Sequence, residues 1–207
     1  LIPIFFNALA ESAGVHEDLY LSYWGYAGSI ATVLVAIIGP VCGAIADRKN
    51  KRGIFLTCLL VGVAAFALLG AMDSWMSFLA MFILARVGYS ASLVFYDSML
   101  PEITSRERMD KISSLGYAFG YIGSVIPFAV CLVLVLMHDS FGMSQVTALI
   151  ISFVLTAVWW VVCSVPLAKR YKQTAFHANG GKPVGDSFKQ LARTFKEAKK
   201  HKHIFVY

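Results

Sequence analysis

Five long apolar stretches, separated by short polar connections, dominate the sequence. They cover residues 20–46, 54–72, 76–100, 112–137 and 145–167. A helix needs about 20 mostly apolar residues to cross the ~30 Å hydrocarbon layer of a bilayer, and each stretch is of that order. Lipid offers no hydrogen-bond partner to a backbone, so each stretch must satisfy its own N–H and C=O groups as a helix. The sequence therefore predicts an all-α fold, a polytopic bundle of membrane helices.

The composition agrees with a lipid environment. Hydrophobic residues make up 58% of the chain and charged residues only 14%, whereas soluble proteins contain about 25% charged residues. The net charge of +6 would suit a nucleic acid, but the basic residues lie beside apolar stretches and no nucleic-acid-binding motif accompanies them. We therefore exclude nucleic acid and expect these cations to meet membrane lipids, whose headgroups attract them.

Lysine and arginine are almost confined to every second connection. Seventeen of the 18 lie in three stretches, residues 48–52, 106–111 and 169–202. The connections between these contain acidic residues but no lysine or arginine, at residues 7–21, 73–75 and 138–144. Short loops rich in lysine and arginine stay on the cytoplasmic side. The alternation therefore predicts both the topology and the orientation of the bundle.

The two ends of the chain resemble parts of further helices. Residues 1–6 are expected to end a first helix and residues 203–207 to begin a seventh, so that residues 1–168 form the bundle. Residues 169–202 then form a cytoplasmic linker. Within it, residues 186–200 alternate an apolar and a cationic face at helical spacing, which predicts an amphipathic helix on the membrane surface. A calmodulin-like partner is the alternative explanation of that segment.

The connection after the first complete stretch contains a charged motif, G-A-I-A-D-R-K-N-K-R at residues 43–52. It resembles the loop between helices two and three of the major facilitator superfamily, G-x-x-x-D-R/K-x-G-R-K/R. Four positions match: Gly43, Asp47, Arg48 and Arg52. Lys51 stands where arginine is usual, and Asn50 where glycine is usual. The resemblance implies a major facilitator fold, of which this chain is the first six-helix half, with these charges as a cytoplasmic gate. The alternative is a positive-inside loop with an incidental aspartate.

Two ionisable residues lie inside the stretch 76–100. Counted at 1.5 Å per residue, Arg86 falls near the middle of the bilayer and Asp97 near its cytoplasmic side. A charged group in a membrane helix requires a partner or a wet cavity. We expect Asp97 to join the gate as a partner of Lys51 or Arg52. Arg86 either lines a cavity, where it binds an anionic group or couples protons, or bonds helix-end carbonyls in a structural role.

The stretch 112–137 is rich in glycine. Gly116 and Gly120 have the G-x-x-x-G spacing that lets membrane helices approach closely, and Gly123 follows them. Pro127 is expected to kink this helix, because proline removes one backbone hydrogen bond.

Three tyrosines complete the set of cavity candidates. Tyr117 and Tyr121 lie on the glycine-rich helix, and Tyr89 lies close to Arg86. Each offers a ring and a hydroxyl to a solute. The alternative is that each tyrosine serves packing alone.

Three segments resemble one branch of the superfamily more closely. They are F-Y-D-S-M-L-P-E-I at residues 95–103, the glycine-rich run at 113–123 and the basic run at 188–197. They are similar to the UMF1 or Atg22-like branch, the vacuole-effluxer-like permeases. The resemblance covers nearly the whole chain and implies a twelve-helix permease. It also implies amino acids as the substrate class, which is associated with the eukaryotic members.

The functional expectation is a secondary active transporter that moves a small solute, with amino acids favoured, by alternating access. A coupling proton is included as an open alternative. The membrane would be the cell membrane in a bacterium and the vacuolar membrane in a eukaryote. Another small solute or a drug, or a non-transporting receptor or scaffold, remain the alternatives.

An integral membrane enzyme such as a lipid acyltransferase is the remaining rival class. The sequence contains no His-Asp cluster, nucleophile elbow or metal-spaced carboxylates, and its histidines lie in connections or tails. No catalytic residue, metal or cofactor is therefore expected. The four cysteines lie in apolar stretches and are expected to be small buried side chains.

Overall fold

The computed structural model describes residues 1–46, 50–171 and 173, and this part of the chain is an all-α bundle. Its long helices are α1 (Ile2–Ser12), α2 (Tyr20–Ala46), α3 (Lys51–Ala67), α4 (Trp75–Ile103), α5 (Met109–Leu136) and α6 (Gln145–Arg170). Three short 3-10 turns precede or follow them: η1 (Glu17–Leu19), η2 (Leu68–Ala71) and η3 (Arg106–Arg108). The all-α prediction is confirmed.

Five helical segments of the described chain, α2 to α6 with their adjoining turns, are long and apolar enough to cross a membrane. Their bounds lie within a few residues of the predicted apolar stretches, and α3, α4, α5 and α6 each extend further into the connections that were predicted to be cytoplasmic. The expected amphipathic helix at 186–200 and the start of a seventh helix at 203–207 lie outside the described residues.

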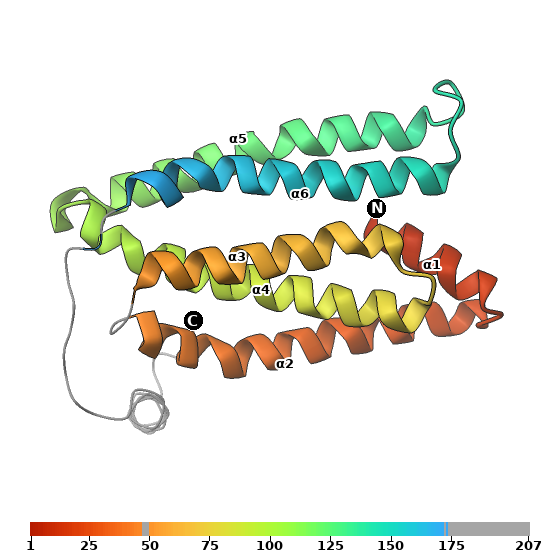
Figure 1. The fold of residues 1–207 in the computed structure, drawn as a ribbon, viewed down its shortest axis with the longest axis horizontal. Coiled ribbons are helices and arrows are strands. Elements are labelled where there is room, and N and C mark those ends of the chain that lie inside the picture. Colours follow the sequence, from red (N-terminus) through yellow and green to blue (C-terminus); the bar gives the residue numbers. More distant parts are fainter. Residues whose placement is uncertain (47–49, 172, 174–207) are drawn as a thin grey trace, which may run out of the picture.

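Helix α4 is the central element of the first four helices. It packs against α1, α2 and α3 and joins α3 through a tight connection (Figure 1). Helices α5 and α6 form an antiparallel pair beside this group, and α6 contacts α3. The connections that were predicted to lie outside the cell are all at one end of the bundle, and the described ends of α2, α4 and α6 are at the other, together with the starts of α3 and α5.

The core divides into two clusters of buried side chains. An aromatic cluster at the outer end joins α1, α4 and α6: the ring of Phe5 lies 5.4 Å from that of Phe78 and 5.5 Å from that of Phe153. A second cluster near the basic connections contains Phe55, Phe95 and other residues of α3 and α4. Each end of the bundle is therefore held by its own apolar contacts.

Within the described chain, helix α5 is buried along one narrow face only. Its buried residues, Pro127, Cys131 and Val135, recur every four positions. The thiol of Cys131 lies 3.7 Å from the carbonyl oxygen of Ser152 on α6. Most other side chains of α5 are exposed, including many large apolar ones, as a helix in contact with lipid requires.

Glycine allows the closest helix approach between α3 and α4. A Cβ atom placed on Gly88 would lie 2.7 Å from the Cα of Gly62, too close for any side chain. The prediction had instead placed close approach on α5. At Gly120 and Gly123 a Cβ would meet no described atom within 4 Å, and at Gly116 only the Tyr96 hydroxyl at 3.5 Å. Within the described chain the α5 glycines thus have no close neighbour, and Pro127 lies inside a helix that continues to Leu136.

The α3–α4 crossing generates a stability prediction. Replacing Gly88 by alanine should push the two backbones apart and lower the free energy of unfolding by about 1–3 kcal/mol. Gly120→Ala is the matched control, because its new methyl group meets nothing in the described chain and alanine favours a helix by about 1 kcal/mol. Thermal unfolding in detergent measures both. Equal stability of the two variants would contradict the close crossing.

Candidate functional site

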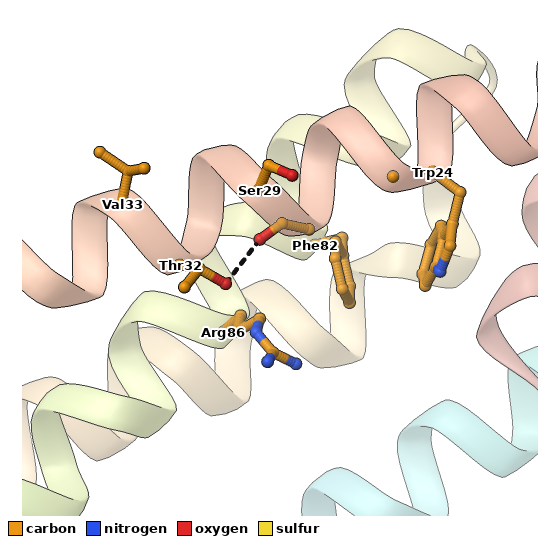
Figure 2. Close-up of a pocket in the computed structure, with 8 residues that line it drawn as sticks. Trp24, Ser29, Thr32, Val33, Phe82 and Arg86 are labelled. Carbon is orange, nitrogen blue, oxygen red and sulfur yellow. Dashed lines mark hydrogen bonds between the residues drawn. The ribbon is translucent and has the colours of Figure 1, made fainter. Parts of the chain in front are cut away.

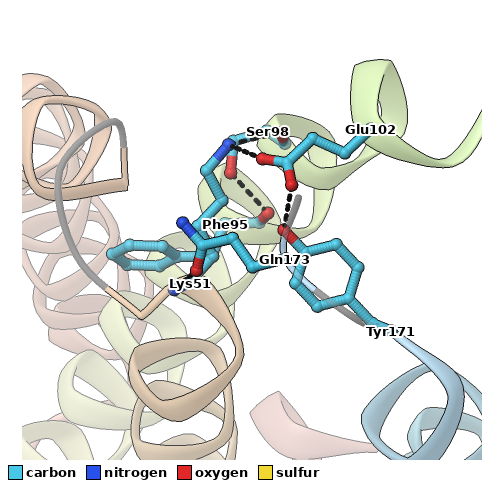
Figure 3. Close-up of polar contacts among 6 residues, drawn as sticks. All are labelled: Lys51, Phe95, Ser98, Glu102, Tyr171 and Gln173. Carbon is cyan, nitrogen blue, oxygen red and sulfur yellow. Dashed lines mark hydrogen bonds and ion pairs between the residues drawn. The ribbon is translucent and has the colours of Figure 1, made fainter. Parts of the chain in front are cut away.

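A buried ion pair lies between the start of α3 and the end of α4. Lys51 is the first residue of α3 and is only 7% exposed. Its Nζ lies 2.5 Å from Oε1 of Glu102, near the end of α4, and also donates a hydrogen bond to the carbonyl oxygen of Ser98 at 3.1 Å (Figure 3). The Glu102 side chain is 8% exposed. Two opposite charges are thus withdrawn from solvent together, on neighbouring helices.

The residues that follow α6 complete this cluster. Tyr171 is buried, and its hydroxyl donates to Oε2 of Glu102 at 3.0 Å. The backbone N–H of Lys51 donates to Oε1 of Gln173 at 3.1 Å. We call these five residues the cytoplasmic cluster, after the side of the membrane predicted for this end of the bundle: Lys51, Ser98, Glu102, Tyr171 and Gln173. It connects the ends of three helices by direct polar contacts (Figure 3).

The charge of Glu102 also affects Tyr171. Burial, followed by the hydrogen bond to Glu102 and the charge of that carboxylate, raises the pKa of the Tyr171 phenol well above its ordinary value. The phenol therefore keeps its proton at neutral pH and remains a hydrogen-bond donor to Glu102.

Local sequence explains the position of Lys51. Asn50 is the N-cap of α3: its Oδ1 accepts a hydrogen bond from the N–H of Gly53 at 3.1 Å. A cation at a helix N-terminus is repelled by the helix dipole, and burial adds a desolvation cost. The carboxylate of Glu102 offsets both, which is why this lysine requires an acidic partner.

The predicted partner of Lys51 was Asp97, and the structure places Glu102 there instead. Five residues separate these two carboxylates, which corresponds to about 140° around the axis of α4. Asp97 is exposed and forms no ion pair with any described residue. Sequence analysis missed Glu102 as a gate residue, although it lies in the L-P-E-I segment whose resemblance was noted.

The other gate candidates are only partly described. Asp47 and Arg48 lie outside the described residues. Arg52 is exposed and forms no ion pair within the described chain. Gly43 lies near the end of α2, and a Cβ placed there would meet no described atom within 4 Å. Among the described gate candidates, only Lys51 therefore takes part in the cytoplasmic cluster.

Arg86 lies near the middle of α4 and contributes to two cavities. One cavity, of about 520 Å³, lies between α2 and α4 (Figure 2). It is lined by Trp24, Gly25, Gly28, Ser29, Thr32, Val33, Phe82 and Arg86. The other, of about 350 Å³, is lined by Ile2, Phe66, Phe82, Ala85, Arg86, Tyr89, Thr156 and Trp160. Phe82 and Arg86 thus form the wall that the two cavities share.

The predicted tyrosines separate into two groups. Tyr89 lines the second cavity beside Arg86, with its ring 5.5 Å from that of Trp160 in an edge-on contact. Tyr117 and Tyr121 lie on the exposed surface of α5 and line neither cavity. The residues of α2 that line the larger cavity were not predicted as a cavity surface, although they recur at three- and four-residue spacing, the period of one helix face.

Nothing in the described chain forms a metal site: no three histidine, cysteine or acidic side chains gather there. The four cysteines are not joined by disulfides. Cys42 and Cys131 are buried as expected, Cys58 is half-buried, and Cys163 is exposed, contrary to the expectation for an apolar stretch. Its position on a membrane helix explains the difference, since an exposed apolar side chain can face lipid.

Residues 12–207 match the family described as vacuole effluxer Atg22 like. The chain is also 32% identical, over its whole length, to an uncharacterized MFS-type transporter, YxiO, of Bacillus subtilis (strain 168). It spans 50% of that relative's length. No solved structure matches the chain.

The cytoplasmic cluster generates a second stability prediction. Glu102→Gln leaves the buried Lys51 ammonium without a counter-charge, which should lower the free energy of unfolding by about 3–5 kcal/mol. Asp97→Asn makes the same chemical change on the same helix at an exposed position, and should be nearly neutral. Thermal unfolding measures both variants.

The double variant Lys51→Met with Glu102→Gln provides the complementary control. It removes both charges, so much of the stability lost in Glu102→Gln should return. If Glu102→Gln and Asp97→Asn unfold at the same temperature, the ion pair does not stabilise these helix ends.

Proposed function

This chain belongs to the vacuole effluxer Atg22-like family, and on that premise we propose that the protein is a secondary active transporter that moves a small solute by alternating access. In such transporters two helical bundles rock around a binding site near the bilayer midplane. The chain is a multi-pass membrane protein of this transporter type. The chain spans half the length of its Bacillus subtilis relative, so transport is proposed for the full-length protein and not for this chain alone.

The buried ion pair between Lys51 and Glu102 is the observation that carries this proposal. Its charges lie on different helices at the cytoplasmic end, 2.5 Å apart. While they remain paired and buried, separating them is costly, because each would lose its counter-charge. Once the helix ends move apart, water can solvate both. The pair therefore favours two arrangements of the helix ends, one with the charges paired and buried and one with both charges hydrated, over any intermediate. A gate requires two such states.

We propose that the rest of the charged motif extends this gate. Asp47, Arg48 and Arg52 belong to the same motif as Lys51 and resemble the gate residues of the major facilitator superfamily. Tyr171 donates to the Glu102 carboxylate and Gln173 accepts from the Lys51 backbone N–H, so the residues after α6 bind both members of the pair. In this proposal the gate joins α3, α4 and α6, and its opening frees all three helix ends.

Amino acids are the favoured substrate class, on the resemblance to the Atg22-like permeases, and a proton is the proposed coupling ion. Membrane lipids are the proposed partners of the basic connections, since Lys169 and Arg170 end α6 on the side where the other basic residues lie. The membrane is proposed to be the cell membrane in a bacterium and the vacuolar membrane in a eukaryote.

Transport assays on the full-length protein in liposomes test the proposal. A mixture of labelled amino acids should move across the membrane under an imposed proton gradient. Asp47→Ala should abolish this movement without loss of expression, because the gate loses a charge. Glu102→Gln should lower the initial rate about tenfold or more, the change that a loss of about 1.4 kcal/mol would produce.

Glu107→Gln is the matched control for this assay. Glu107 is an exposed glutamate near the same end of the bundle, and its replacement should leave the rate unchanged. Absence of movement with the unmodified protein would contradict amino-acid transport. A normal rate in both Asp47→Ala and Glu102→Gln would contradict the gate.

A further inference from the structure

The guanidinium group of Arg86 has no counter-charge within the described chain. It forms no ion pair or hydrogen bond with any described residue, and it lies about 16 Å along α4 from Trp75. A charged side chain at this depth is costly unless it faces a wet cavity or an anionic partner. The face of the bundle that carries Arg86 should therefore border a wet cavity or an anionic partner and not lipid.

Helix α2 leaves open space beside this guanidinium. Gly25, Gly28, Ser29 and Thr32 recur at helical spacing and line the larger cavity with Arg86. A Cβ placed on Gly25 or on Gly28 would meet no described atom within 4 Å. Within the described chain these two glycines make no close helix contact, and their small size leaves the cavity open.

An aromatic wall forms one side of the same cavity. The rings of Trp24 and Phe82 lie 4.6 Å apart and are tilted by 36° (Figure 2). Phe82 precedes Arg86 by one helical turn, so the wall and the guanidinium are adjacent on α4. The cavity therefore offers an apolar surface and a cation to the same solute.

Thr32 adds a hydrogen-bond acceptor. Its hydroxyl donates to the carbonyl oxygen of Gly28 at 2.8 Å (Figure 2). A hydroxyl has one proton and two lone pairs, so with its proton engaged Thr32 can only accept a hydrogen bond from a solute. A matching solute would carry an N–H donor as well as an anionic group.

We propose that the cavity between α2 and α4 binds the carboxylate of a small solute with an apolar side group. The fork of Arg86 binds the carboxylate in bidentate geometry, and the Trp24–Phe82 wall receives the apolar group. A carboxylate fits better than a phosphate, because Arg86 is the one cation among the described lining residues and a doubly charged phosphate would remain half neutralised. This inference rests on the proposed transport function and names what the transporter recognises.

Binding measurements on the full-length protein in detergent test the inference without any flux. The probes are L-phenylalanine and L-phenylalaninamide, which differ only at the carboxyl group, and inorganic phosphate. L-Phenylalanine should bind, and the amide should bind about 10- to 100-fold more weakly, the change expected when a charged hydrogen-bonding partner is lost. Arg86→Gln should weaken L-phenylalanine by a similar factor, and Arg86→Lys by less, because it keeps the charge but not the fork.

Gly28→Leu provides a second variant that leaves every charge in place. Its side chain should occupy the cavity and abolish binding of L-phenylalanine, and its Cβ meets no described atom. Ile30→Phe is the matched control: it adds bulk to an exposed position about 200° away on α2 and should bind normally.

The outcomes separate this inference from the transport proposal. Failure of L-phenylalanine to bind, equal binding of the amide, or normal binding in Arg86→Gln and Gly28→Leu would overturn the carboxylate site even if labelled amino acids cross the membrane. Arg86-dependent binding of phosphate tighter than that of L-phenylalanine would overturn the carboxylate assignment. Carboxylate binding without flux would instead count against transport.

Discussion

The pairing of Lys51 with Glu102 is the interaction on which the cytoplasmic end of the bundle depends. Without Glu102, a lysine at the start of α3 would meet both the positive end of the helix dipole and a desolvation cost. With it, the carboxylate also accepts a hydrogen bond from Tyr171, and the Lys51 backbone meets Gln173. One buried pair of charges thus links three helix ends, beside an apolar cluster that packs in the same region.

A close backbone crossing makes this pairing geometrically possible. Gly62 and Gly88 let α3 and α4 approach until no side chain fits between them. Their approach sets the register of the two helices, and through it the carboxylate of α4 that reaches Lys51. At the outer end, the rings of Phe5, Phe78 and Phe153 hold α4 to α1 and α6. The buried ion pair therefore lies at one end of the bundle, and the cation that lines the two cavities, Arg86, lies near the middle of α4.

The all-α fold and the helix bounds could be predicted from the sequence, because apolar length acts locally along the chain. An acidic partner on α4 for Lys51 and a cavity beside Arg86 could also be predicted, because a buried charge requires one or the other. The identity of that partner could not be predicted in the same way. Asp97 and Glu102 are both near the same end of α4, and which of them reaches Lys51 depends on how α3 and α4 pack against each other. Gly28 and Thr32 were not predicted, because a small or uncharged side chain in an apolar helix gives no signal in the sequence until its neighbours across the cavity are known.

The narrow line of contact along α5 has a mechanical consequence. Pro127, Cys131 and Val135 attach this helix to α6, and α6 in turn meets α3. Since α6 is the main neighbour of α5 and ends one residue before Tyr171, a displacement of α5 would reach the cytoplasmic cluster mainly through α6. If α5 and α6 moved together, the hydrogen bond between Tyr171 and Glu102 would be the first contact of the cluster to be strained. A movement of the exposed helix α5 would thereby be passed on, through Tyr171, to the ion pair between Lys51 and Glu102.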